Sequence, residues 1–206
     1  MNEPLWLASA SPRRKALLAG MGLRFRVAKV AFREHVPEGI PPEEAARYLA
    51  WRKAETARRR IRRGLIITGD TVVALGTRRF GKPRSRADAR RILRMLAGRT
   101  HRVITGLAVI DAANGTGVVG SAVSDVVFRR LSAAAIAAYV ATGEPMDKAG
   151  AYAIQGGAGA FVLRIRGSYS NIVGLPVGLL RALLARMGRA PRRGLRKRLG
   201  QRPARR

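Results

Sequence analysis

The sequence predicts an α/β fold built on a mixed β-sheet, and three observations support this prediction. Short apolar runs alternate with longer segments whose apolar residues recur every three or four positions, which is typical of alternating strands and helices. Asn114-Gly115 joins two apolar runs, as expected for an antiparallel hairpin. Hydrophobic residues make up 47% of the 206 residues, enough for one domain or for two small lobes that share a core. Because hairpins interrupt the alternation, we expect a mixed rather than a purely parallel sheet.

Local signals divide the first half of the chain into elements. Ser11 and Pro12 suit the N-cap and the first position of a helix, since Ser can accept a free backbone N–H and Pro lacks one. The run LIITGDTVVAL (65–75) is the strongest strand signal, and Gly64 before it should end a long amphipathic helix. The expected elements are a strand at 4–8, a helix at 12–20, a strand at 24–30, a polar loop at 31–41, a helix at 42–62 and a strand at 65–75 that continues to residue 80 as a hairpin arm.

Helix starts and hairpins also mark the second half. Ser85 with Asp88 resembles a capping box, and Ser132 and Pro176 mark two later helix starts. The expected elements are a helix at 85–96, strands at 102–111 and 118–129, a helix at 132–142, a Gly-rich irregular segment at 143–160, a strand at 161–166 and a helix from 176 to 188. We therefore predict a domain at 1–188, followed at 189–206 by a basic tail without regular structure.

Charge is the most unusual feature of the composition. The chain has 41 Lys or Arg and 12 Asp or Glu, which gives a net charge of +29. A polyanionic partner, either phosphate ligands or nucleic acid, would account for this excess. A compositional bias would do so equally well, because Arg greatly outnumbers Lys. The tail at 189–206 suits weak, nonspecific contact with nucleic acid.

The composition also excludes some classes of protein. Cysteine is absent, which excludes disulfides and thiolate zinc sites, and His35 and His101 are too distant in sequence to suggest a histidine site. A divalent metal would need carboxylates, which favours Mg²⁺ or Mn²⁺. The sequence has no apolar run of membrane-spanning length and no secretory signal pattern, so we expect a cytoplasmic location and no membrane contact.

Two arginines stand at the start of the first helix, where acidic residues are normally favoured. Arg13 and Arg14 are unfavourable next to the positive end of the helix dipole, by roughly 0.3–1 kcal/mol each. A phosphate bound there would reverse the sign, because it would accept bonds from backbone N–H groups, guanidinium groups and the hydroxyls of Ser9 and Ser11. Two solvated arginines on a basic protein would leave the same pattern.

Lys53 and Asp70 are placed as oddly as the arginines. Lys53 lies inside the apolar stripe of the 42–62 helix, so it either reaches past the edge of the core or points into a cleft. Asp70 follows the apolar LIIT run, and ligand sites of α/β sheets gather at the carboxyl ends of strands. Asp70 could therefore bind a metal or act as a general base. It could also be an aspartate in a hairpin turn. Lys82 in Gly-Lys-Pro and the Gly-rich segment after Gln155 are weaker phosphate-site signals.

Taken in order, these segments resemble the Maf family of nucleotide pyrophosphatases. The matching segments are LASASPRRKALL (7–18), KAE (53–55), GDTVV (69–73), GKPR (81–84), LAGRTHRVITGLAV (96–109), ATGEPMDKAGAYAIQG (141–156) and GSYSNIVGLP (167–176). The resemblance implies an elongated mixed sheet flanked by helices, with two lobes around a central cleft (Maf/ITPase-like). It also implies a homodimer and a metal-dependent hydrolase that converts a nucleoside triphosphate into a monophosphate and pyrophosphate.

The resemblance also assigns roles to residues. Asp70 matches the proton acceptor, and Glu34 matches the acidic loop residue that would hold the metal with Asp70. The residues that match phosphate contacts are Ser9, Arg13, Arg14, Lys53 and Lys82. Three positions that separate the substrate branches of the family read Arg13, Thr71 and Gln155, as in the dTTP/UTP branch, where the 7-methyl-GTP branch has Trp, Gln and Glu. A neutral Gln suits a pyrimidine edge, whereas Glu suits a cationic methylated base.

Three alternatives remain open from sequence. One is 7-methyl-GTP or broad nucleotide specificity, and another is a basic nucleic-acid-binding protein, although aromatic residues are only 5% of the chain. The third is an inactive relative, because Arg33 stands where the family commonly has an acid beside Glu34.

Overall fold

Seven strands form one mixed sheet in the computed structural model, which describes residues 3–189. The order is β2-β1-β3-β5-β6-β7, and β4 also pairs with β3. β1 runs parallel to both β2 and β3, and the other pairs are antiparallel, which confirms the predicted mixed sheet. The strands are β1 (Leu5–Ala8), β2 (Arg26–Ala28), β3 (Leu65–Leu75), β4 (Arg78–Phe80), β5 (Thr100–Asp111), β6 (Gly117–Phe128) and β7 (Val162–Arg166).

The helices follow the predicted order with two differences. They are α1 (Pro12–Ala19), α2 (Pro42–Arg58), α3 (Arg86–Leu96), α4 (Ala133–Ala141), α5 (Tyr169–Val173) and α6 (Val177–Arg186), and 3₁₀ turns η1 (Glu144–Asp147), η2 (Ala149–Ala151) and η3 (Gly157–Phe161) occupy the Gly-rich segment. α5 was not predicted from the sequence, and α2 ends at Arg58 rather than at 62. Of the expected basic tail, residues 190–206 lie outside the described part of the chain. Between residues 3 and 189, no helix is long and apolar enough to cross a membrane.

Serine caps start three of the helices as predicted. The hydroxyls of Ser11, Ser85 and Ser132 each accept the backbone N–H three residues later. Gly64, in contrast, does not end α2. It has a φ of +93°, and a Cβ there would lie 2.0 Å from the carbonyl oxygen of Pro4. Gly64 therefore allows β3 to begin directly against the residue before β1.

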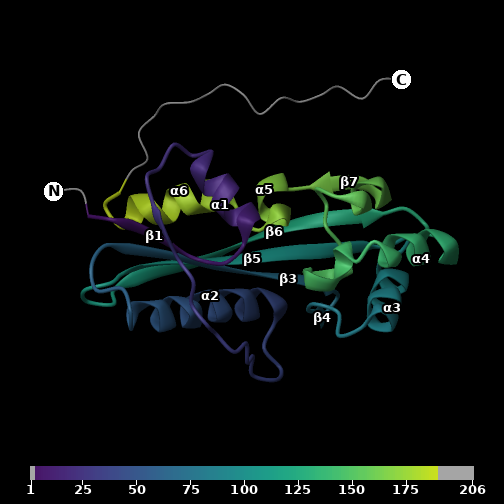
Figure 1. The fold of residues 1–206 in the computed structure, drawn as a ribbon, viewed down its shortest axis with the longest axis horizontal. Helices are drawn as coiled ribbons and strands as arrows, with labels where there is room; N and C mark the ends of the chain where they lie inside the picture. The colour runs from purple at the N-terminus through teal and green to yellow at the C-terminus, as the bar shows by residue number, and fades with distance from the viewer. Residues whose placement is uncertain (1–2, 190–206) are drawn as a thin grey trace.

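Helices cover both faces of the sheet (Figure 1). α2 lies on one face, where its Ala50, Ala54 and Ala57 pack on Ile66 and Ile110. On the other face α1 and α6 pack on alternate residues of the same strands, in a cluster that includes Leu7, Leu18, Ile67, Leu107 and Leu183. Because successive strand residues point to opposite faces, one strand supplies both cores.

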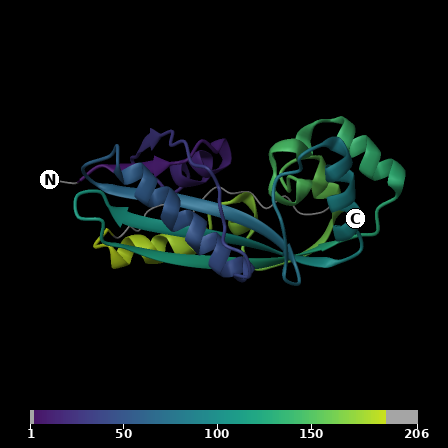
Figure 2. The same cartoon turned by 90° about the horizontal axis from the view of Figure 1, so that it is seen from below.

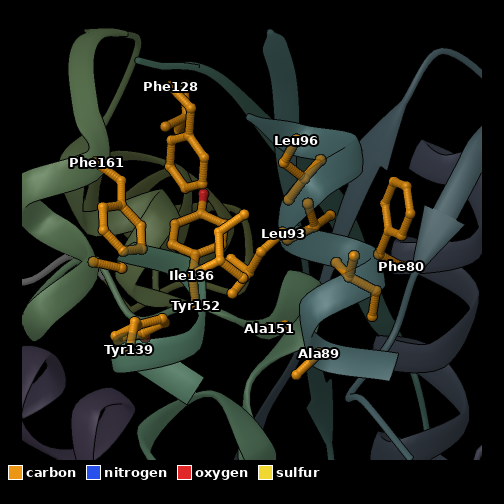
Figure 3. Close-up of a cluster of buried hydrophobic side chains, with 14 of the residues drawn as sticks. Phe80, Ala89, Leu93, Leu96, Phe128, Ile136, Tyr139, Ala151, Tyr152 and Phe161 are labelled. Carbon is orange, nitrogen blue, oxygen red and sulfur yellow. The ribbon is translucent and has the colours of Figure 1, made fainter. Parts of the chain in front are cut away.

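A second group of elements gathers at the far end of the long strands β3, β5 and β6 (Figure 2). Here α3, α4 and the 3₁₀ turns enclose an apolar cluster that includes Phe128 (Figure 3). Edge-to-face contacts join Phe128 to Tyr152 and Phe161. The long strands therefore connect two lobes, as the resemblance implied.

One edge of β3 is interrupted at the middle of the strand. β1 pairs with β3 only at Leu65–Ile67, and β4 pairs with the same strand only at Val73–Leu75. Between them, the segment 68–72 has no strand partner on that side among the described residues. The opposite edge stays paired to β5 throughout. The backbone at 68–72 is thus rigid on one side and open on the other.

Candidate active site

A cleft of about 740 Å³ lies at this open part of β3, between the two lobes. Its walls come from the end of β1, the start of α1, the loop before α2, the middle of β3, the loop after β4 and the segment from η1 to Gln155. It brings together every site residue predicted from sequence: Ser9, Arg13, Arg14, Glu34, Lys53, Asp70, Thr71, Lys82 and Gln155.

Asp70 and Lys53 form the central ion pair of the cleft. The Nζ atom of Lys53 donates to Oδ1 of Asp70 at 2.5 Å and to Oε1 of Glu34 at 2.8 Å. Asp70 is buried, with 7% of its surface exposed, and the Lys53 side chain is 18% exposed. Lys53 therefore points into the cleft and does not reach past the core to solvent. Within residues 3–189, Oδ2 of Asp70 accepts no hydrogen bond from the protein.

Asp70 reaches this position in the middle of a strand rather than at a turn or at the end of β3. It pairs in register with Gly106 of β5. A Cβ on Gly106 would lie 2.1 Å from the carbonyl oxygen of Ala46, so the missing side chain lets α2 pack directly on the sheet. Lys53 lies seven residues after Ala46 on the same helix face, which directs its side chain to Asp70. The rule that sites lie beyond strand ends still holds for β1, whose last residue precedes Ser9.

Neighbouring charges decide the ionisation of Glu34. Partial burial acts to raise the pKa of Glu34, but the hydrogen bond and charge of Lys53, together with Lys82 and Arg14, outweigh it and lower the pKa below its usual value. Glu34 is therefore a carboxylate at neutral pH. Phe32, on the same loop, places its ring 5.5 Å from the Lys53 ammonium and shields that side of the cluster.

Thr71 and Arg14 form a second polar group on the other face of the sheet. Arg14 donates from Nε to the carbonyl of Gly174 at 2.8 Å and from Nη2 to the Thr71 hydroxyl at 3.0 Å. Burial lowers the pKa of the Arg14 guanidinium, and Asp70 opposes that effect. Since an arginine remains protonated in proteins, Arg14 is a fixed positive charge in the cleft wall. Much of its fork is thus already engaged, which the phosphate-binding interpretation of the sequence did not anticipate.

The remaining predicted residues line the cleft with freer side chains. Arg13 stands in the first turn of α1, which contains no acidic residue. Lys82 is exposed and follows Gly81, whose carbonyl is fixed by the Gly150 amide. The Ser9 hydroxyl accepts from the Ser11 amide at 3.2 Å. An anion in the cleft would therefore meet positive side chains on several sides.

Sequence reasoning missed Asp147 and Lys148, which line the cleft and pair with each other. Both stand in the matched segment 141–156, but no local spacing singled them out. Arg33, which replaces a common family acid, is exposed and is not part of the cleft wall. The two carboxylates that contact Lys53, Asp70 and Glu34, are therefore in place although residue 33 is an arginine.

The two carboxylates of the cleft suit a hard divalent cation bound together with a substrate. Among residues 3–189, no three His, Asp or Glu side chains converge as a ready-made metal site. Glu34 and Asp70 nevertheless lie close together, since both contact the Lys53 ammonium group. Mg²⁺ is commonly held by one or two carboxylates plus phosphate oxygens and water, so this donor set fits that ion.

Comparison with known proteins identifies the family of the chain. The model of the family described as "Maf-like protein" matches residues 4–187. A dTTP/UTP pyrophosphatase of Desulforamulus reducens is 46% identical over 90% of this chain and 97% of its own length. One from Anaeromyxobacter dehalogenans (strain 2CP-1) is 48% identical over 91% of this chain and 96% of its own length.

A solved nucleoside-triphosphatase / dITP/XTP pyrophosphatase from Mycobacterium abscessus aligns with 62% of this chain and 75% of that one. Its TM-score of 0.40 and identity of 17% make the likeness too remote to bear on function. The family model, by contrast, spans nearly the whole described fold and all of the cleft residues, and the two relatives match 90% and 91% of this chain. The chain therefore belongs to the Maf-like protein family.

Proposed function

We propose that this protein hydrolyses dTTP and UTP to the nucleoside monophosphate and pyrophosphate. The names of its relatives support the substrate class. The observation that carries the proposal is the Asp70 carboxylate, which lies in a cleft with Arg13, Arg14 and Lys82. Lys53 holds one of its oxygens, and no other residue of the described chain 3–189 bonds to the second. A buried acid surrounded by cations suits hydrolysis of a polyanion.

The triphosphate is bound by charge and by the start of α1. Arg13, Lys53 and Lys82 neutralise its oxygens, and the backbone N–H of Arg13 in the first turn of α1 adds a donor. These groups also stabilise the charge that spreads over the transferred phosphoryl oxygens in the transition state. The base and sugar extend toward Thr71 and Gln155.

Asp70 supplies the general base. A water molecule hydrogen-bonded to Oδ2 of Asp70 gives up its proton as it attacks the α-phosphorus, and pyrophosphate leaves. Lys53 keeps Oδ1 fixed, so the carboxylate cannot rotate away from the water. Glu34 and Asp70 are the residues that would hold Mg²⁺ or Mn²⁺, which when bound supplies Lewis-acid stabilisation of phosphate oxygens.

Pyrophosphate release from a panel of nucleotides tests the proposal. The purified protein, with and without Mg²⁺ or Mn²⁺, should release pyrophosphate from dTTP and UTP faster than from 7-methyl-GTP. Asp70→Asn should lower kcat by about 10²- to 10⁴-fold, because the amide cannot accept the proton. Near-wild-type turnover in this variant would rule out Asp70 as the base.

Asp125→Asn is the matched control for that substitution. Asp125 also lies within a long strand, β6, but it is not part of the cleft wall. The same isosteric loss of a carboxylate there should leave kcat close to wild type. An equal loss of turnover in both variants would point to general damage to the sheet rather than to loss of a base.

A further inference from the structure

A directed chain of hydrogen bonds links the cleft to α5. The Thr71 hydroxyl lies 3.0 Å from Arg14 Nη2 and 3.0 Å from the Thr105 hydroxyl, and Thr105 in turn lies 2.9 Å from the carbonyl oxygen of Asn171. Thr105 is fully buried, whereas Thr71 forms part of the cleft wall. The chain therefore runs from the cleft into the interior.

The direction of each hydrogen bond follows from the chemistry of its ends. A guanidinium can only donate and a carbonyl can only accept. Thr105 must therefore give its single hydroxyl proton to Asn171, which leaves Thr71 as the donor in the Thr71–Thr105 pair. Thr71 also accepts from Arg14. With its proton and one lone pair used, Thr71 has only one lone pair left for a ligand in the cleft.

The far end of the chain is held in place by its surroundings. The side-chain amide of Asn171 donates to the Val103 carbonyl and to the Ser124 hydroxyl, each at 2.9 Å. The carbonyl of Asn171 also accepts the Gly174 amide at 2.9 Å. These bonds fix α5 to β5 and β6. The backbone carbonyl of Asn171 can only accept, so Thr105 is the donor in the bond between them.

A group that can only accept selects a ligand that donates. Phosphate oxygens are acceptors, so Thr71 does not suit the triphosphate. Uracil and thymine carry an N3–H donor at the position where cytosine carries a bare acceptor nitrogen. Gln155 cannot make this distinction by itself, because its exposed amide can turn either its donor or its acceptor to the base.

We propose that Thr105 and the Asn171 carbonyl make Thr71 an obligate acceptor for the N3–H of uracil and thymine, so that this chain discriminates against cytosine. The inference rests on the proposed function and names a positioning residue, Thr105, that acts through Thr71. If the Thr71 hydroxyl were free to rotate, it could donate to the N3 nitrogen of cytosine, and the preference for uracil over cytosine would be lost.

Kinetics with UTP, CTP and N3-methyl-UTP test the proposal. We expect wild-type kcat/KM for UTP to exceed that for each of the other two by about tenfold or more, since each analogue leaves the Thr71 lone pair without a donor. Thr105→Val frees the Thr71 proton and should lower the UTP:CTP ratio by about tenfold. Thr105→Ser keeps the hydroxyl and should restore the ratio.

Thr68→Val provides the matched control. Like Thr105, Thr68 is buried, and its hydroxyl donates to a backbone carbonyl, that of Ala50. Thr68 lies on β3 and faces α2. Its loss should lower stability by a similar amount and leave the UTP:CTP ratio unchanged. The control therefore separates the orientation of Thr71 from general weakening of the sheet.

The possible outcomes distinguish this inference from the proposed function. Absence of pyrophosphate release from UTP by the wild type would refute the function, and the inference with it. Release from UTP with an unchanged UTP:CTP ratio in Thr105→Val would refute only the inference. If Thr105→Val does not fold, an equal kcat/KM of the wild-type protein for UTP and CTP would still overturn the inference.

Discussion

At the residue scale, one lysine organises both carboxylates of the cleft. Lys53 is shared between Asp70 and Glu34, so each acid has a counter-ion before any substrate arrives. The pair with Asp70 is largely desolvated, and removal of either partner would leave an uncompensated charge. We therefore expect Lys53 and Asp70 to be energetically coupled, and the cleft to depend on both residues.

His101 gives the fold a pH dependence that is independent of the cleft chemistry. It is buried between Phe128 and Tyr152, and burial lowers its pKa from 6.5 to about 4. The folded state thus keeps His101 neutral while the unfolded chain takes up a proton below pH 6.5. This contribution to stability is full above pH 6.5 and is lost as the pH falls toward 4.

The predicted loss from His101 is on the order of 3 kcal/mol between pH 7 and pH 4. Urea unfolding of wild type and His101→Phe at the two pH values measures it, because Phe fills the aromatic cluster but does not titrate. The free energy of unfolding should fall more steeply in the wild type, by about that amount. Identical pH dependence in the two proteins would show that His101 is not buried as a neutral ring.

The sequence singles out side chains that conflict with their local setting, and the structure places them in one cleft. Lys53 inside an apolar stripe, and arginines in a first helical turn, signalled the cleft without any knowledge of the fold. Thr105 and Asp147 gave no such signal. A buried threonine in a strand is ordinary, and its partner Asn171 lies 66 residues away.

At the element scale, the contact between α2 and β5 sets the geometry of the site. Gly106 lets the backbone at Ala46 lie against the sheet, opposite Asp70 in register. The same helix carries Lys53. The distance between helix and sheet thus controls the ion pair at the base of the cleft.

Gly106→Ala tests this dependence. The added methyl group would overlap backbone atoms of α2, so we expect a loss of about 1–3 kcal/mol in unfolding free energy and a lower kcat. Gly178→Ala in α6 is the matched control. A Cβ there meets no atom within 4 Å, so stability should stay the same or rise by up to about 1 kcal/mol. Thermal unfolding and pyrophosphate release measure both, and an unperturbed Gly106→Ala protein would contradict the role of the contact.

Element positions were largely predictable because their signals are local. Ser11, Ser85 and Ser132 mark helix starts through bonds to residues three positions away, and Asn114-Gly115 marks a hairpin. α5 was missed because a five-residue helix between Gly167 and Gly174 has no periodicity to detect. Gly64 was misread because its positive φ serves a contact with Pro4, which is distant in sequence.

At the scale of the whole molecule, the interrupted edge of β3 explains how one site uses both faces of a sheet. Asp70 points to α2, whereas the next residue, Thr71, points to α1 and α5. Both remain accessible only because β1 stops before them and β4 starts after them. The proposed general base and the proposed base-binding hydroxyl therefore point from opposite faces of β3.

The gap in the sheet could not be predicted from sequence. The run 65–75 predicts a continuous strand, and nothing in it reveals which residues lack a neighbour. Strand pairing depends on long-range contacts, whereas the net charge of +29 and the order of the matching segments are properties of the sequence alone. The class of fold was therefore predictable, and the shape of the cleft was not.

Hydrolysis of UTP in H₂¹⁸O shows which phosphorus atom the water attacks, and it therefore decides whether the proposed reaction takes place. If water activated by Asp70 attacks the α-phosphorus, mass spectrometry will find one ¹⁸O atom in UMP and none in pyrophosphate. Label in pyrophosphate, or release of orthophosphate with UDP, would contradict the account.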